Sequence, residues 1–388
     1  MTLAQTVATT AAARVSAIRP AEPVRVMVVD DSPMIRRVLT SWLNELSDVR
    51  VVAAHANGRL AVDDVVRARP DVVILDIEMP EMDGLTALPL LLARRPGVMV
   101  LLASTLSRRG AEVTIKGLTL GAADYLTKPE GTAGLTTDQY RAELVAKVRQ
   151  LGRRKPLRQR AQPVPSLQGD GRPDAGGVAA AGEPGMRLRP YSMSVVRCLV
   201  IGSSTGGPQA LGKVLTDIGP PLARVPVLIT QHMPPTFTAI LADHLGKATG
   251  IPTAEARDGE PVRAGRILVA QGGLHLLVAR SGEGIVARLS DAPPENFCKP
   301  AVDPLFRSAA EAFGAGTLAV VLTGMGTDGA KGSMAVADAG GSVIAQDAET
   351  SVVWGMPGAT AAAGTCSGIL PVGEIGPRIA RMLTGVRS

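Results

Sequence analysis

The chain has 388 residues, of which 46% are hydrophobic and 20% charged, with a formal net charge of +6 and a pI near 9.5. This length exceeds that of one ordinary compact core and indicates two domains. The composition argues against a chain that is disordered throughout, and the lack of an apolar run of about 18 residues argues against a membrane span.

Residues 1–22 are expected to form a flexible N-terminal tail. The stretch LAQTVATTAAARVSAIRP has no basic leader before its weak apolar part, unlike an export signal. We therefore expect a cytoplasmic protein with no membrane-embedded part.

Residues 23–146 predict a first α/β domain. Runs rich in β-branched residues at 25–29, 49–54, 71–75 and 98–102 alternate with amphipathic stretches. Such alternation is typical of a doubly wound parallel sheet with helices on both faces. Ligands of these sheets bind beyond the carboxyl ends of the strands.

Acidic residues stand at those strand ends. Asp30 and Asp31 end the first strand and Asp76 follows the third. Three neighbouring carboxylates repel one another unless a cation such as Mg2+ lies between them. Ser104 follows the fourth strand and Lys128 a fifth, and this set suits phosphoryl transfer to an aspartate. Taken singly, each residue has an ordinary alternative as a helix cap or a surface side chain.

The stretches VVDDSPMIRRVL, VVILDIEMPEMDGL, LLASTLS and AADYLTKP resemble a response-regulator receiver domain over residues 24 to about 146. The resemblance implies a flavodoxin-like fold with Asp76 as the phosphoacceptor. It further implies Mg2+ binding by Asp30, Asp31, Asp76 and the backbone carbonyl of Glu78, phosphoryl contacts from Ser104 and Lys128, and a switch aromatic at Tyr125.

Residues 147–192 have the composition of a linker. Five of the ten residues in LGRRKPLRQR, 151–160, are basic, and a segment rich in Pro, Gly and Ala follows. No aromatic or helical recognition pattern accompanies the basic run, so a solvated tether is favoured over a DNA-reading element.

Residues 193–388 predict a second α/β domain, with a mostly parallel sheet. Its stretch CLVIGSSTGGPQALGKVL holds a G-x-S-x-G pattern at 202–206, between a strand and a helix, with Ser204 at the centre. A tight turn of this kind exposes the serine hydroxyl next to a helix N-terminus that can stabilise an oxyanion. A phosphate-binding or structural turn is the alternative, so a catalytic interpretation needs a base and an acid.

The candidate base is His232, because it directly follows the strand VPVLIT. His244 lies on a probable helix, where an exposed or capping role is favoured, and His275 lies inside a probable strand. The candidate acid is Asp328, which follows the apolar run TLAVVL; Asp303 is its rival, with helix capping as the alternative role. The resulting order Ser, His, Asp differs from that of α/β-hydrolases, although geometry defines a triad.

The stretches VIGSSTGGPQAL, LITQHMPPTFT, FCKPAVDPLF, VLTGMGTDGAKG and AQDAETSVVWGMPGA resemble the catalytic domain of chemotaxis protein-glutamate methylesterases, the CheB family, over residues 195–388. The resemblance implies that Ser204 is the nucleophile, His232 the general base and Asp328 its orienting acid. It places the oxyanion near the backbone N–H of Met325 and the Thr205 region.

Two departures from the family pattern are small. Ser203 stands where alanine is frequent, and Cys298 precedes Lys299 at a variable position. We expect neither to touch the triad. Cys198, Cys298 and Cys366 lie far apart without a CxxC pair, which supports neither a disulfide framework nor a zinc site and favours buried, reduced thiols.

The resemblance implies hydrolysis of glutamate methyl esters on chemoreceptors, with release of methanol through an acyl-enzyme, and deamidation of receptor glutamines by the same route. It implies Mg2+ in the receiver, no cofactor for the ester step and a chemotaxis histidine kinase as phosphodonor. The fusion of a receiver to a hydrolase leads us to expect that the unphosphorylated receiver covers Ser204 and that phosphorylation of Asp76 favours open forms.

Two alternatives remain open from the sequence. One is a phosphorylation-controlled nucleotide- or DNA-binding regulator without hydrolase activity. The sequence contains neither G-x-G-x-x-G nor a P-loop lysine, which disfavours nucleotide binding. Only 2% of the residues are aromatic, which disfavours base stacking, so we expect no nucleic-acid partner. The other is an esterase or amidase that acts on a different modified protein.

Overall fold

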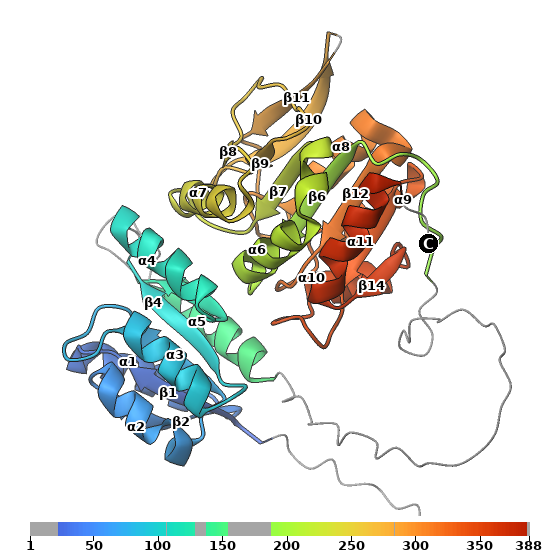
Figure 1. Ribbon diagram of the computed structural model, residues 1–388. Helices are drawn as coiled ribbons and strands as arrows, with labels where there is room; N and C mark the ends of the chain where they lie inside the picture. Colours follow the sequence, from blue (N-terminus) through green and yellow to red (C-terminus); the bar gives the residue numbers. More distant parts are fainter. Residues whose placement is uncertain (1–21, 106, 129–136, 154–187, 283, 386–388) are drawn as a thin grey trace, which may run out of the picture.

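The structure is a computed structural model that describes residues 22–105, 107–128, 137–153, 188–282 and 284–385. Figure 1 shows two α/β units, one N-terminal (blue to teal) and one C-terminal (green to red). The expected tail, 1–21, and the stretch 154–187 of the expected linker lie outside the described residues.

The N-terminal unit contains a five-stranded parallel sheet in the order β2-β1-β3-β4-β5. The strands are β1 (Val24–Val29), β2 (Val49–His55), β3 (Val72–Asp76), β4 (Met99–Ser104) and β5 (Asp124–Thr127). The helices are α1 (Pro33–Asn44), α2 (Gly58–Ala68), α3 (Gly84–Arg94), α4 (Arg108–Thr119) and α5 (Thr137–Gly152).

Helices cover both faces of this sheet because its strands are apolar on both sides. Val26 and Val28 of β1 belong to a core cluster with α1 and α5, whereas Met27 and Val29 belong to a cluster with α2, α3 and α4. The expected doubly wound, flavodoxin-like fold is therefore confirmed. Helix α5 continues to Gly152, past residue 146, where we expected the domain to end.

The C-terminal unit contains a seven-stranded parallel sheet in the order β14-β13-β12-β6-β7-β9-β8, and an antiparallel hairpin, β10-β11. The strands are β6 (Cys198–Ser203), β7 (Val227–Gln231), β8 (Thr253–Glu255), β9 (Ile267–Val269), β10 (His275–Ser281), β11 (Gly284–Ser290), β12 (Thr317–Val321), β13 (Ser342–Gln346) and β14 (Gly368–Leu370). The helices are α6 (Gly207–Ile218), α7 (Phe237–Thr249), α8 (Val302–Phe313), α9 (Ala330–Asp338), α10 (Met356–Ala362) and α11 (Val372–Thr384), with short 3-10 helices η2 (Pro220–Arg224) and η3 (Gly314–Gly316).

Strand β6 shows how this sheet is buried on both faces. Leu199 and Ile201 pack in the core that includes α6, α7 and α11, whereas Cys198 and Val200 pack in the core that includes α8 and α9. The chain passes from β6 to β7 on one side and later returns to β12 on the other side of β6. In open α/β sheets such a reversal opens a crevice at the carboxyl ends of the strands. The fold therefore places a site where β12, β6 and β7 end.

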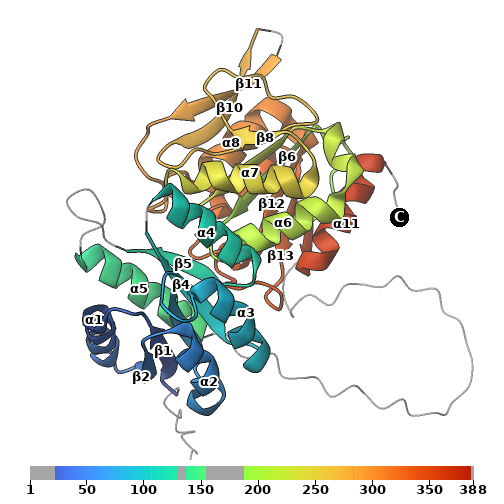
Figure 2. The same cartoon turned by 60° about the vertical axis from the view of Figure 1, so that its left-hand side comes forward.

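The two units are in contact. Helix α4 lies beside α6 and α7, as both views of the ribbon show (Figures 1 and 2). The Gln209 side chain on α6 donates to the backbone carbonyls of Leu118 and Ala122, and Thr119 Oγ1 lies 3.2 Å from His244 Nε2.

Among the described residues, no helix is both long and apolar enough to cross a bilayer.

Candidate active site

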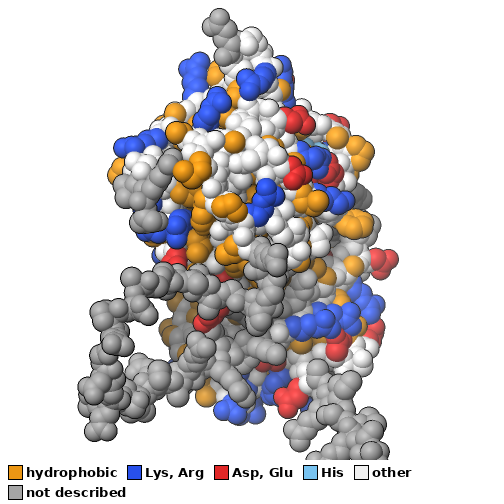
Figure 3. All heavy atoms as spheres, turned by 90° about the vertical axis from the view of Figure 1, so that its right-hand side faces the viewer, with side chains coloured by type: hydrophobic (Ala, Val, Ile, Leu, Met, Phe, Trp, Pro, Cys, Tyr) orange, Lys and Arg blue, Asp and Glu red, His pale blue; other side chains and the backbone are white. Residues whose placement is uncertain are grey.

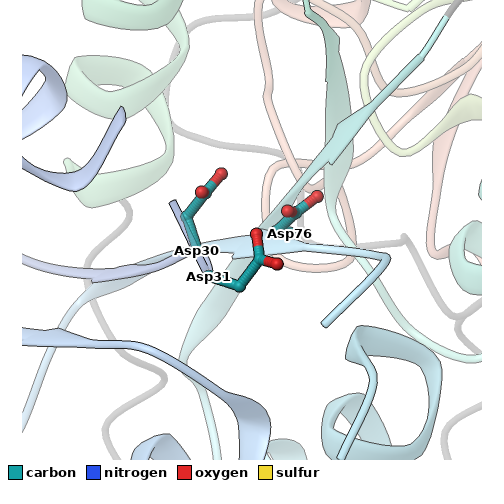
Figure 4. A group of neighbouring side chains, drawn as sticks. All are labelled: Asp30, Asp31 and Asp76. Carbon is teal, nitrogen blue, oxygen red and sulfur yellow. The ribbon is translucent and has the colours of Figure 1, made fainter. Parts of the chain in front are cut away.

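The N-terminal unit gathers three carboxylates at the carboxyl ends of β1 and β3. Asp30, Asp31 and Asp76 each place an oxygen within 4.8 Å of the others, and Figure 4 shows the three side chains grouped there. The Lys128 ammonium lies 2.8 Å from Asp76 and 3.0 Å from Asp30. Burial raises the pKa of Asp76 in spite of this lysine, whereas the two aspartates raise the pKa of Lys128 against the effect of its own burial.

The structure brings most of the other predicted residues to the same place. A cavity of about 340 Å3 is lined by Asp31, Asp76, Glu78, Ser104 and Lys128, among others. The Ser104 hydroxyl donates to the backbone carbonyl of Gly110 in α4 and accepts a 2.6 Å hydrogen bond from Thr114.

Tyr125 faces the C-terminal unit. Its ring is buried and stacks on Phe237 at the start of α7, with centroids 4.8 Å apart and planes 10° from parallel. Tyr125, for which the resemblance to receiver domains implies the role of switch aromatic, thus forms part of the contact between the units.

In the C-terminal unit, the turn after β6 separates the two adjacent serines. Ser203 is fully buried and its hydroxyl donates to Gln231 Oε1 at 2.6 Å. Ser204 is partly exposed and lines a cavity of about 580 Å3. Its backbone N–H donates to the carbonyl of Thr323 after β12, which ties the turn to the neighbouring strand. Only Ser204 is therefore placed to meet a substrate.

A glycine is required where the loop after β12 reaches this turn. A Cβ on Gly324 would lie 2.8 Å from the Cβ of Ser204 and 2.4 Å from the sulfur of Met356. The next residue, Met325, lines the same cavity as Ser204. The loop that carries the predicted oxyanion donor thus packs directly against the serine.

His232 and Asp328 form a pair in this crevice. The backbone N–H of His232 donates to the carbonyl of Ser203, and its Nε2 lies 2.8 Å from Asp328 Oδ2. Asp328 is 1% exposed and also accepts hydrogen bonds from the backbone N–H groups of Val302, Asp303 and Gly329. These donors fix the carboxylate and compensate for its burial.

His232 and Asp328 shift each other's pKa in opposite directions. Burial lowers the pKa of His232, but its hydrogen bonds to Asp328 and Cys298 outweigh that effect and raise the pKa to about 9. Burial raises the pKa of Asp328, and the hydrogen bond and charge of His232 reverse this, so the pKa lies below the ordinary value. Both shifts have the same physical cause, which is the attraction between the His232 ring and the Asp328 carboxylate at 2.8 Å.

The rival residues have structural partners elsewhere. Asp303 accepts from the backbone N–H groups of Gly329 and Gly332, which agrees with a capping role at the start of α9. His275 is buried, accepts from the N–H of Ala301 and lies 3.0 Å from the carbonyl oxygen of Pro293. His244, for which we expected an exposed or capping role, instead contacts α4 of the N-terminal unit.

The N-terminal unit forms one wall of the Ser204 cavity, with Asp124, Tyr125, Glu143 and Lys147 among the lining residues. The Thr205 hydroxyl donates to Asp124 Oδ2 at 2.6 Å, and both residues are buried. Lys147 lies 3.2 Å from the same aspartate and 3.0 Å from Glu143. The residue next to the candidate nucleophile is thus held by the other unit.

The expectation that Cys298 does not touch the triad is wrong. Its Sγ lies 3.4 Å from Nδ1 of His232, and its side chain is partly exposed, whereas Cys198 and Cys366 are buried as expected. Asn296 was also missed, and its Nδ2 donates to Asp328 Oδ1 at 2.9 Å. No signal in the sequence reveals these contacts, because they depend on how the turn before Lys299 folds back over the site.

Comparisons with known proteins agree with both units. The family model "CheB methylesterase" matches residues 199–379, and the model "Response regulator receiver domain" matches residues 26–138. A protein-glutamate methylesterase/protein-glutamine glutaminase from Rhodopseudomonas palustris (strain BisB5) is 50% identical over 371 residues, with 95% of this chain and 96% of the relative covered. A relative of the same description from Nitrobacter hamburgensis is 52% identical over 373 residues, with the same coverage of 95% and 96%. Among solved structures, the Thermotoga maritima CheB methylesterase catalytic domain is 38% identical, with a TM-score of 0.47, and the match covers 48% of this chain and 98% of that one.

The contact with Asp328 is expected to raise the pKa of His232. We expect the His232 imidazole to titrate near pH 9 in an NMR pH series and Asp328→Asn to lower that midpoint. Since the folded-state pKa exceeds the unfolded value of about 6.5, the pair stabilises the fold fully below pH 6.5, and this contribution is lost as the pH rises through 9. His244, whose pKa burial lowers, is an internal control. A His232 midpoint at or below 6.5 would contradict the pair.

Proposed function

The chain belongs to the family of protein-glutamate methylesterases/protein-glutamine glutaminases, and we propose that Ser204, His232 and Asp328 are the residues that carry its hydrolase activity. The substrates are glutamate methyl esters on chemoreceptors, which yield methanol, and receptor glutamines, which yield ammonia. The observation that carries the assignment is the 2.8 Å contact between His232 and a buried Asp328, in a crevice that also exposes Ser204.

The proposed reaction is acyl transfer. Ser204 Oγ attacks the ester carbonyl while its proton passes to His232. Because Nε2 of His232 faces Asp328, the nitrogen that receives the proton is Nδ1. His232 then returns the proton to the departing methoxide, and methanol leaves a glutamyl ester on Ser204. Water, deprotonated by the same nitrogen, hydrolyses that ester and restores the receptor glutamate and the free serine.

The negative oxygen of the tetrahedral intermediate needs donors close to Ser204. The backbone N–H of Met325 and the N–H groups around Thr205 are the proposed donors, since both residues line the cavity with Ser204. The N-terminus of α6 begins two residues after Thr205 and adds a positive electrostatic potential. No cofactor takes part in these steps.

The N-terminal unit is the receiver, with Asp76 as the proposed phosphoacceptor and a chemotaxis histidine kinase as phosphodonor. Carboxylate oxygens are the ligands that Mg2+ prefers, and the grouping of Asp30, Asp31 and Asp76 fits such an ion. These three side chains and the backbone carbonyl of Glu78 would hold it, and the bound ion would neutralise charge on the phosphoryl oxygens. Lys128, already 2.8 Å from Asp76, would contact the phosphoryl group together with Ser104.

Regulation is proposed to act through the contact between the units. In the described structure the receiver forms a wall of the Ser204 cavity, and Thr205 is hydrogen-bonded to Asp124. A receptor segment has to reach Ser204, so we infer that this arrangement is the resting one. Phosphorylation of Asp76 would shift the population towards forms in which the receiver moves away.

The DNA-binding alternative gains no support. On the face drawn in Figure 3, Lys and Arg side chains lie in small groups separated by acidic, polar and apolar ones. A nucleic-acid interface would require a continuous basic surface.

Ser204→Ala is expected to lower methanol release from a methylated chemoreceptor by roughly 1000-fold or more, since loss of the nucleophile removes the acyl-enzyme route. Ser203→Ala is the matched control and should keep most of the activity, because Ser203 is fully buried and bonded to Gln231. Equal activity of wild type and Ser204→Ala would refute the assignment.

Asp76→Asn is expected to abolish stimulation by a small-molecule phosphodonor while basal methanol release persists. The amide cannot form the acyl phosphate, whereas the triad in the other unit is untouched. The measurement compares initial rates with and without the donor, in the presence of Mg2+. Full stimulation of the variant would show that Asp76 is not the regulatory phosphoacceptor.

Gln209→Ala is expected to raise basal methanol release several-fold without a phosphodonor. The substitution removes the hydrogen bonds from α6 to the carbonyls of Leu118 and Ala122, each worth about 0.5–1.5 kcal/mol, and so favours open forms. Lys213→Ala on the same helix is the control, because Lys213 pairs with Asp217 inside the C-terminal unit. An unchanged basal rate in Gln209→Ala would argue against this contact as a restraint.

A further inference from the structure

A tight turn at Glu295–Cys298 lies over the catalytic pair. The backbone N–H of Cys298 donates to the carbonyl of Glu295 at 2.8 Å, and the N–H of Glu295 donates back to Cys298 at 3.2 Å. The two central residues, Asn296 and Phe297, have positive φ angles of 51° and 64°. Such values are unusual for a residue as bulky as phenylalanine, and strained backbone of this kind is concentrated at functional sites.

The turn directs Asn296 towards two buried carboxylates. Its Nδ2 donates to Asp328 Oδ1 and to Asp303 Oδ2, both at 2.9 Å. Because both partners are acceptors, the nitrogen of the amide has to face them, so the orientation of the side chain is fixed. Asn296 thus bridges the two carboxylates and fixes Oδ1 of Asp328, while Oδ2 of the same carboxylate faces Nε2 of His232.

The same turn directs Cys298 towards the other side of the histidine. Its Sγ lies 3.4 Å from Nδ1, while Nε2 lies 2.8 Å from Asp328. The contact is favourable in both states of the ring, because a neutral Nδ1 accepts from the thiol and a protonated Nδ1 donates to sulfur. Nδ1 is also the nitrogen that has to take the proton of Ser204.

In the described structure, therefore, the thiol stands at the nitrogen that the nucleophile must reach. No hydrogen bond joins the Ser204 hydroxyl to His232 among the described residues, whereas Asp328 holds the Nε2 edge of the ring and Cys298 holds the Nδ1 edge. A ring held in this way keeps its orientation until Ser204 approaches.

We propose that the Glu295–Cys298 turn positions the catalytic base, with Asn296 orienting Asp328 and the Cys298 thiol holding the Nδ1 edge of His232 until the Ser204 hydroxyl replaces it. Asn296 and Cys298 are positioning residues that act through Asp328 and His232. The inference rests on the proposed function, because it takes His232 as the base.

Four variants of the full chain test the proposal: Cys298→Ala, Cys298→Ser, Asn296→Ala and, as a control for loss of a buried thiol elsewhere, Cys366→Ala. Two measurements are made on each. One is the NMR titration of the His232 imidazole without substrate, and the other is kcat and KM for methanol release in the presence of phosphodonor and Mg2+.

Cys298→Ala is expected to lower the titration midpoint of His232 and to reduce kcat by roughly 10- to 100-fold with little change in KM, because a misplaced base slows proton transfer rather than binding. Cys298→Ser should recover most of both values, since a hydroxyl can replace the thiol at Nδ1. Asn296→Ala should reduce kcat in the same way, and Cys366→Ala should match wild type.

An unmoved His232 midpoint in Cys298→Ala, or equal loss of kcat in Cys298→Ala and Cys298→Ser, would overturn the proposal. The titration needs no turnover, so it decides this point even if Ser204→Ala stays active and the proposed function fails. Should the alanine variants not fold, alkylation of the wild type with iodoacetamide replaces them. It is expected to label Cys298 but not the buried Cys198 and Cys366, and to lower kcat, while unchanged kcat after complete labelling would count against the proposal.

Discussion

The buried carboxylate of Asp328 is the constraint on which the C-terminal site depends. Asp328 is 1% exposed, and a charged carboxylate so deeply buried is unfavourable unless hydrogen-bond donors replace the lost water. Asp328 has five such donors. They are the backbone N–H groups of Val302, Asp303 and Gly329, Nδ2 of Asn296 and Nε2 of His232. The Asp328 carboxylate thereby holds four segments together: the start of α8, the start of α9, the Glu295–Cys298 turn and the end of β7. Loss of that carboxylate would loosen the site as well as the base.

The shortest strand of the receiver connects the proposed phosphoacceptor to the C-terminal unit. Strand β5 has four residues, and Lys128 follows its end with the ammonium against Asp76. At its beginning, Asp124 accepts from Thr205 and Tyr125 stacks on Phe237, close to His232 in the chain. A change of charge at Asp76 would therefore act on a lysine only three residues from the aromatic contact, which gives the proposed regulation a short path to the wall of the cavity.

The sequence was sufficient for the strands of the N-terminal sheet and for the grouping of acidic residues at their ends, because strands buried on both faces are apolar throughout and the polar residues that end them stand out. The G-x-S-x-G spacing favoured Ser204 over Ser203, but it could not show whether that serine is catalytic, and the sequence left Asp303 as a rival of Asp328. The structure separates them by burial and partners: Ser203 and Asp303 are bonded within the fold, whereas Ser204 lines the cavity and Asp328 contacts His232. The contacts of Asn296 and Cys298 were out of reach, because they depend on two left-handed residues in one turn.

The order Ser, His, Asp along the chain follows from the topology of the sheet. The proposed nucleophile follows β6, the proposed base follows β7 on one side of it, and the proposed acid lies in the loop after β12 on the other side. Because β12, β6 and β7 are neighbours, their carboxyl ends meet in one crevice irrespective of the order in which the chain visits them. The proposed triad is therefore compatible with this fold, although its chain order differs from that of α/β-hydrolases. In this crevice Nε2 of His232 faces Asp328, and Nδ1, the edge that Cys298 holds, is left for the proposed nucleophile.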